Sequence, residues 1–256
     1  MRKKEQKPDK WLAYTSLAWT EQIIASPEDS VEETEIYTRA IKRHARIKTK
    51  TLLHLGCGGG FNDFTFKKHF KVTGVDISKE MLDVAEKLNP GVAYQQGDMR
   101  TIRLPECFDA VAIPDSIGYM TTLRDLKRTI TTAYEHLKKD GLLLIVTNTK
   151  EQFKENNFIY TGSKEDIEIT IFENNYVHDP SGSAYEATLI YLIRRTGKLE
   201  IYSDRHIIGL FKLKEWMDLL AEIGFKVKQE EIKHLYDRFI PDDAEYPLLM
   251  FACIKI

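Results

Sequence analysis

The residues best suited to hold a ligand are the glycines that follow a short apolar run, Thr51 to Leu55. The chain there reads Gly56-Cys-Gly-Gly-Gly60, and Phe61 to Phe70 has the pattern of a helix. Glycine adopts positive φ angles at little steric cost, and its missing Cβ lets a ligand approach the backbone. A strand, a glycine turn and a helix start in this order predict a ligand site. The alternative is a tight turn with no further function.

The glycine spacing excludes two common nucleotide-binding sites. No Lys-Ser or Lys-Thr pair follows the turn, so the segment is not the phosphate-binding loop of nucleotide hydrolases. The dinucleotide fingerprint requires a glycine at position 61, where the sequence has Phe61. The spacing still fits a mononucleoside ligand at the switch point of a doubly wound sheet.

Three further predicted strands run into loops that contain an acidic residue. Lys71 to Val75 leads to Asp76, Val92 to Gln96 leads to Gly97-Asp98-Met99, and Phe108 to Ile113 leads to Pro114-Asp115-Ser116. An acidic residue about 20 positions after the glycines is placed to bind ribose hydroxyls. Ligands of open α/β sheets bind at the carboxyl ends of the strands, so we expect all four loops to converge on one site.

These four segments, in this order, resemble the motifs of the class I S-adenosylmethionine-dependent methyltransferases. The matching segments are Leu55-Gly-Cys-Gly-Gly-Gly, Val75-Asp-Ile-Ser78, Gly97-Asp98-Met99 and Phe108 to Met120, within a resemblance that covers roughly residues 36–256. The resemblance implies an α/β fold with a doubly wound, seven-stranded, mostly parallel sheet. The chain departs from the family at His54, where an acidic residue usually contacts the amino group of the cofactor's methionine part.

The resemblance also implies S-adenosylmethionine as the cofactor and a set of residues that bind it. The expected cofactor-binding residues are Tyr14, Gly56, Cys57, Gly58, Asp76, Ile77, Met81, Asp98, Met99 and Ile113. For Cys57, the role of a small filler beside the ligand is favoured over that of a nucleophile. Packing within the protein is the alternative for Tyr14 and Met81. No cysteine has metal-ligand spacing, so we expect no metal site.

Length and composition limit the class of protein and its partners. At 256 residues, one α/β domain with an appendage is expected. The formal net charge of −2, from 37 basic and 39 acidic residues, argues against nucleic acid as the main partner. Apolar runs fall short of the ~20 residues that span a bilayer, and the N-terminus lacks the apolar core of a signal sequence. The three cysteines, an odd count, indicate a reducing cytoplasm.

The periodicity of the chain divides it into three parts. Residues 1–50 are a charged tail and two helices, Trp11 to Ala25 and one that Ser30 caps, which the resemblance implies form a cofactor lid. Residues 51–150 and 211–256 form the cofactor-binding core. Residues 151–210 alternate like an antiparallel insert of three or four strands after the fifth strand, with a turn at Asn174-Asn175.

This layout is similar to the N,N-dimethyltransferases of nucleotide-linked amino sugars, and implies a small-molecule acceptor. We expect methyl transfer to an amine nitrogen, with oxygen as second choice, and catalysis mainly by orientation. Tyr119 and His206 are the candidates to orient the acceptor or take its proton, and Asp115 is a further proton acceptor. The insert would cap the substrate or form a homodimer. The alternatives are a methyltransferase of RNA or protein, and a catalytically silent cofactor-binding module.

Overall fold

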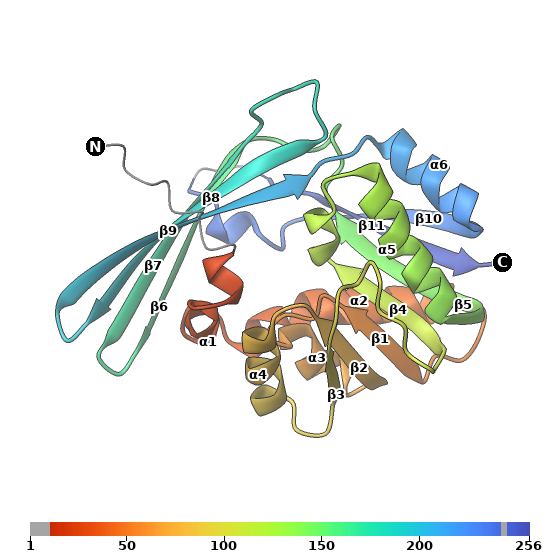
Figure 1. Cartoon of the computed structure of the whole chain (residues 1–256), viewed down its shortest axis with the longest axis horizontal. Helices are drawn as coiled ribbons and strands as arrows, with labels where there is room; N and C mark the ends of the chain where they lie inside the picture. The colour runs from red at the N-terminus through yellow and green to blue at the C-terminus, as the bar shows by residue number, and fades with distance from the viewer. Residues whose placement is uncertain (1–10, 242–244) are drawn as a thin grey trace, which may run out of the picture.

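The computed structural model describes residues 11–241 and 245–256, and a seven-stranded sheet with helices on both faces forms its centre (Figure 1). Its strands are β1 (Thr51–Leu55), β2 (Lys71–Asp76), β3 (Ala93–Gln96), β4 (Phe108–Pro114), β5 (Leu137–Thr147), β10 (Phe225–Ile232) and β11 (Leu248–Lys255). They lie in the order β10-β11-β5-β4-β1-β2-β3. Strands β1 to β5 are parallel, and β11 is antiparallel to both β5 and β10. The expected doubly wound sheet is confirmed.

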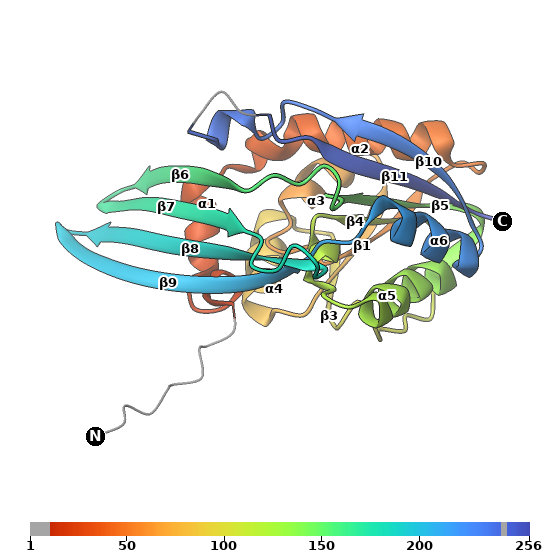
Figure 2. The same ribbon diagram turned by 90° about the horizontal axis from the view of Figure 1, so that it is seen from above.

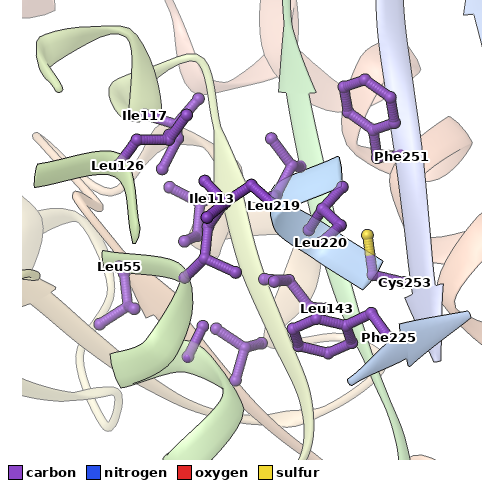
Figure 3. Packing of buried hydrophobic residues seen from close by; sticks show 14 of the residues in the cluster. Leu55, Ile113, Ile117, Leu126, Leu143, Leu219, Leu220, Phe225, Phe251 and Cys253 are labelled. Atoms are coloured by element: carbon purple, nitrogen blue, oxygen red, sulfur yellow. The ribbon is translucent and has the colours of Figure 1, made fainter. Parts of the chain in front are cut away.

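Each face of this sheet is buried under helices, which explains why its central strands are apolar at nearly every position. The helices are α2 (Val31–His44), α3 (Phe61–Phe66), α4 (Lys79–Leu88), α5 (Leu123–His136) and α6 (Leu213–Ile223). Successive side chains of β1 alternate between the two cores: Leu52 packs with α2 and α3, and Leu53 packs with α5 and α6. Figure 3 shows the second of these cores, where Leu126 of α5 and Leu220 of α6 meet the sheet.

The insert is a second, four-stranded antiparallel sheet that projects from one end of the molecule (Figures 1 and 2). Its strands are β6 (Asn156–Lys164), β7 (Ile167–Tyr176), β8 (Ala184–Arg195) and β9 (Lys198–Gly209), paired in chain order. The turn expected at Asn174-Asn175 is wrong, because both residues lie inside β7. The Asn175 side-chain N–H donates to Asn156 Oδ1 at 2.9 Å, so the neighbouring strand accepts a hydrogen bond from a residue type that is also common in turns.

The N-terminal segment is less regular than its sequence predicts. The expected helix from Trp11 to Ala25 is divided into η1 (Leu12–Tyr14), η2 (Ala18–Thr20) and α1 (Glu21–Ile24). Leu17 packs into the insert sheet beside Ile169 and Tyr191. Contact with this sheet, rather than helical periodicity, therefore sets the path of the polypeptide here, and α1 lies alongside β6 of the insert (Figure 1).

The second helix also begins differently from the expectation. A short helix η3 (Pro27–Ser30) precedes α2, and Ser30 makes no side-chain hydrogen bond to the first turn. The Asp29 carboxylate instead accepts the Ser26 N–H at 2.8 Å, one turn earlier. Two further short helices, η4 (Ser116–Tyr119) and η5 (Asp237–Phe239), follow β4 and β10.

Gly162 of β6 allows α1 to lie directly against the insert. A Cβ at this position would lie 2.0 Å from the Ile23 carbonyl oxygen, so Gly162→Val should force the two segments apart. We expect the free energy of unfolding, measured with urea, to fall by about 1–3 kcal/mol. Protease cleavage within residues 11–25 should become faster. The control is Ser163→Val at the neighbouring exposed position; equal stability and cleavage in the two variants would contradict this close packing.

Candidate active site

The four loops that follow β1 to β4 line a single cavity of about 530 Å³. Each loop contributes to the cavity wall, with Gly56, Asp76, Asp98 and Asp115 as one example from each. Residues of η1, α1 and the inner face of the insert line the same cavity. Its remaining wall includes Tyr236 and Tyr246. The strand ends are therefore enclosed by two segments that lie outside the central sheet.

The glycine turn needs its glycines for two different reasons. Gly56 has φ +71°, and a Cβ there would lie 2.3 Å from Ser116 Oγ, so close packing excludes a side chain. Gly58 has φ +53°, and the nearest atom to a Cβ there is the Met81 methyl carbon, at 3.5 Å. Because Gly58 lines the cavity, its backbone is open to a ligand.

Asp76 holds this turn in place. Its Oδ2 accepts the Gly58 N–H, and its Oδ1 accepts the Ser78 N–H at the start of α4, both at 2.8 Å. The carboxylate also lines the cavity. Asp76 therefore combines a structural role with a position from which it can reach a ligand.

Asp98 carries a partner of its own. The Arg100 guanidinium donates to Asp98 Oδ2 at 2.6 Å and also pairs with Asp125. The hydrogen bond from Arg100 lowers the pKa of Asp98, so this carboxylate is ionised at neutral pH. Asp98 and Arg100 line the cavity.

The other expected cofactor residues lie at the same cavity, with one exception. Tyr14, Cys57, Ile77, Met81 and Met99 all line it. Ile113 is fully buried in the core between the sheet and α5 and does not line the cavity (Figure 3).

The chemistry of Cys57 and His54 follows from their buried surroundings. Burial raises the pKa of the Cys57 thiol well above its usual value, which disfavours a thiolate nucleophile. His54 lines the cavity, and its Nδ1 lies 2.7 Å from Oδ1 of the buried Asp63. The Tyr94 hydroxyl donates to the other Asp63 oxygen at 3.0 Å. The Asp63 carboxylate is thus engaged behind His54 and does not line the cavity.

The two candidate catalytic residues are directly hydrogen-bonded to each other. The Tyr119 hydroxyl lies 2.7 Å from His206 Nδ1 and 2.8 Å from the Tyr14 hydroxyl. His206 Nε2 lies 2.8 Å from Asp204 Oδ2, which also accepts the Ala13 N–H. This chain of contacts joins η1, η4 and β9. One feature of the sequence could have indicated Asp204: it lies two residues before His206 and therefore shares its face of the strand.

Two further carboxylates line the cavity. Desolvation by the surrounding cavity atoms, together with the nearby charge of Glu33, raises the pKa of Asp115 to about 7, although the residue itself is exposed. Burial also raises the pKa of Glu173 of β7, although its carboxylate accepts hydrogen bonds from Tyr160 and Asn175. Asp115 was expected at the site, whereas nothing in the alternation of β7 distinguishes Glu173 from a solvent-facing residue.

Comparison with known proteins identifies the family. A sequence profile described as a methyltransferase domain matches residues 52–141. A dTDP-4-amino-2,3,4,6-tetradeoxy-D-glucose N,N-dimethyltransferase of Saccharopolyspora spinosa is 31% identical over 183 residues, which are 71% of this chain and 73% of that one. The chain belongs to the class I S-adenosylmethionine-dependent methyltransferases.

Solved structures share the fold of this methyltransferase over nearly its whole length. The sugar N-methyltransferase KedS8 from Streptoalloteichus superimposes with a TM-score of 0.77 at 20% identity, covering 94% of this chain and 92% of that one. DesVI from Streptomyces venezuelae gives a TM-score of 0.75 at 23% identity, covering 89% and 92%. Membership of the family makes S-adenosylmethionine the cofactor of this methyltransferase.

Residues 11–241 and 245–256 contain neither a membrane-spanning helix nor a cluster of metal ligands. No helix in these ranges is both long enough and apolar enough to cross a bilayer. No group of three or more His, Cys, Asp or Glu side chains there is arranged to hold a metal ion.

Asp76→Ala should weaken binding of S-adenosylhomocysteine, because it removes a carboxylate from the cavity wall and releases the Gly58 N–H. Loss of hydrogen bonds to a charged group corresponds to a decrease of roughly ten- to a hundredfold in affinity. Calorimetric titration measures this, with Asp83→Ala on the exposed side of α4 as control. Unchanged affinity in a folded Asp76 variant would remove this residue from the cofactor site.

Proposed function

We propose that this methyltransferase transfers a methyl group to a nitrogen of a small-molecule amine. The observation that carries this proposal is the buried Tyr119–His206–Asp204 chain, which ends in an enclosed cavity lined by further carboxylates. The relatives that act on amino sugars support an amine: besides the Saccharopolyspora protein, a dTDP-3-amino-3,4,6-trideoxy-alpha-D-glucopyranose N,N-dimethyltransferase of Streptomyces venezuelae is 28% identical over 188 residues. A malonyl-[acyl-carrier protein] O-methyltransferase of Bacillus anthracis is also 28% identical, over 199 residues, and keeps oxygen as the second choice.

The residues at the strand ends fit the cofactor. The open backbone at Gly58 would accept the methionine part, Asp76 the ribose, and the Asp98-Met99 loop the adenine. When bound there, S-adenosylmethionine supplies a methyl group activated by its sulfonium. The neutral leaving group makes alignment and exclusion of water the main tasks of the protein. The glycine turn, η1 and the insert provide the enclosing wall for both tasks.

The Tyr119–His206–Asp204 chain can receive the proton that the acceptor nitrogen loses. Burial opposes ionisation of Asp204, but hydrogen bonds from His206 and the Ala13 N–H lower its pKa overall. Ionised Asp204 favours a proton on His206 Nε2, which leaves Nδ1 free to accept from Tyr119. Burial raises the pKa of Tyr119 well above its usual value, so its hydroxyl stays protonated. Tyr119 can therefore take a proton from the acceptor only as it passes its own to His206.

The charge of the cavity suits an amine that enters as a cation. The Asp115 and Glu173 carboxylates face the cavity together with the rings of Tyr160, Tyr185 and Tyr246. Carboxylates and aromatic faces both attract an ammonium group, and this attraction grows where water is excluded. A neutral hydroxyl acceptor gains much less from these groups.

The proposal is tested by incubating the purified protein and S-adenosylmethionine with nucleotide-linked amino sugars, simpler primary and secondary amines, and matched alcohols. Mass spectrometry of each acceptor should show the gain of one or two methyl groups on amines. Transfer to alcohols alone, or only to added RNA or protein, would overturn it. No transfer, with cofactor binding intact, would favour the silent cofactor-binding module.

His206→Gln should lower kcat by about a hundredfold on an amine acceptor, because Tyr119 then loses its proton acceptor. The affinity for S-adenosylhomocysteine should stay the same, since His206 lies on the insert. Asp204→Asn should lower kcat less and shift the pH profile. His178→Gln, in a turn of the insert, is the control. An unchanged kcat in both cavity variants would mean that orientation alone supplies the catalysis.

We also propose that the outer face of the insert binds a second copy of this chain. Ile159, Phe172, Ile201 and Ile207 share this face, and Ile201 is 62% exposed. Light scattering should give the mass of two chains for the wild type and of one for the double variant Phe172→Asp, Ile201→Asp. Lys164→Asp, at an exposed position on the opposite face of the sheet, is the control. A single-chain mass for the wild type would exclude the homodimer.

The three-part division remains part of the same proposal. Residues 1–50 would act as the lid, 51–150 with 211–256 as the cofactor-binding core, and 151–210 as the substrate cap. A cytoplasmic location and the absence of nucleic-acid and membrane partners likewise remain predictions from composition.

A further inference from the structure

Glu21 places a buried carboxylate over the glycine turn. It is the first residue of α1 and lines the cavity. A Cβ on Gly59 would lie 2.5 Å from Glu21 Oε2, so only a glycine there leaves room for this oxygen. Glu21 Oε2 is buried and has no hydrogen-bond partner within the described part of the chain.

An unpartnered buried carboxylate oxygen is costly, and most such atoms in folded proteins find a donor. The titratable groups around Glu21 supply none. Those that interact with it electrostatically are Asp76 on β2, Cys57 in the turn, Tyr14 on η1 and Tyr191 on β8. Burial, together with the charge of Asp76, raises the pKa of Glu21 to about 8. The site therefore lacks a cationic donor that a ligand could bring.

We propose that Glu21 binds the α-ammonium group of the methionine part of S-adenosylmethionine. This role rests on the proposed function, because it requires the cofactor to lie in this cavity. Of the two cationic centres of the cofactor, the sulfonium has no N–H to donate, whereas the ammonium has three. Glu21 lies over Gly59, next to Gly58, where the backbone is open to the cavity.

The end of β1 offers the cavity no carboxylate of its own, because position 54 is a histidine. The position carries an imidazole whose Nδ1 is bonded to Asp63, and Asp63 does not line the cavity. A carboxylate that arrives from the N-terminal segment instead couples α1 to the amino-acid end of the cofactor. Binding of the cofactor would then hold α1 against the glycine turn.

The binding experiment compares two ligands with and without the ammonium group. S-adenosylhomocysteine carries it, and 5′-methylthioadenosine lacks the whole amino-acid part. Glu21→Gln should weaken binding of S-adenosylhomocysteine at least about tenfold and leave the affinity for 5′-methylthioadenosine unchanged. Glu28→Gln, on the exposed side of η3, is the matched control, and Glu21→Asp should restore part of the loss.

A second readout follows the proton on Glu21. With a pKa of about 8, its carboxylate is mostly protonated at pH 7 in the free protein, and pairing with an ammonium requires it to ionise. Titrations in two buffers of different ionisation enthalpy should show proton release on binding S-adenosylhomocysteine. The affinity should rise between pH 6 and pH 8. Glu21→Gln should abolish the proton release.

The outcomes separate this inference from the proposed function. Equal affinity of wild type and Glu21→Gln for S-adenosylhomocysteine would overturn the role of Glu21 and leave the methyltransferase reaction in place. An equal loss for both ligands would also overturn it, because the carboxylate would then support the turn rather than the ammonium. Failure of the wild type to bind either ligand would instead remove the cofactor from this cavity.

Discussion

The packing of the N-terminal segment against the insert is the interaction on which the site depends. Leu17 and its neighbours share an apolar cluster with Ile169, Ile171 and Ile193 on the inner face of the second sheet. This contact turns the open edge of an α/β sheet into an enclosed cavity. Without it, the strand-end loops would face water, where hydrogen bonds and charges contribute much less to binding.

Enclosure also explains the electrostatic character of the cavity. Asp115, Glu173 and Glu21 have raised pKa values chiefly because the surrounding protein atoms desolvate their carboxylates, and their elements come from three different parts of the chain. Asp115 additionally adopts a positive φ of 57°, a conformation that favours glycine. Desolvated acids and a strained backbone both reduce stability, and proteins keep such features mainly where function needs them. A ligand with cationic groups would offset part of this cost.

The hydrogen-bonded chain from Tyr14 to Asp204 shows how the three parts of the molecule cooperate. Tyr119 follows β4 of the central sheet, His206 and Asp204 belong to the insert, and Tyr14 belongs to the N-terminal segment. The N-terminal segment and the insert also pack against each other, through the apolar cluster around Leu17. These hydrogen bonds therefore form together only when both the insert and the N-terminal segment are packed onto the central sheet.

The sequence by itself determined the central sheet and the strand-end loops that meet at the cavity. Strong local signals mark them: apolar runs that end in glycine or aspartate at β1, β2 and β4, whose bounds match the expectation within one residue. Prediction from the sequence was wrong where a contact with a distant segment overrides the local pattern. The helix expected from Trp11 breaks against the insert, and Asn174 and Asn175 lie inside a strand. Only the tertiary structure brought Tyr119 to His206, which are 87 positions apart, and placed Glu21 over Gly59. Such contacts depend on how separate elements pack together, and the local pattern of residue types does not determine this packing.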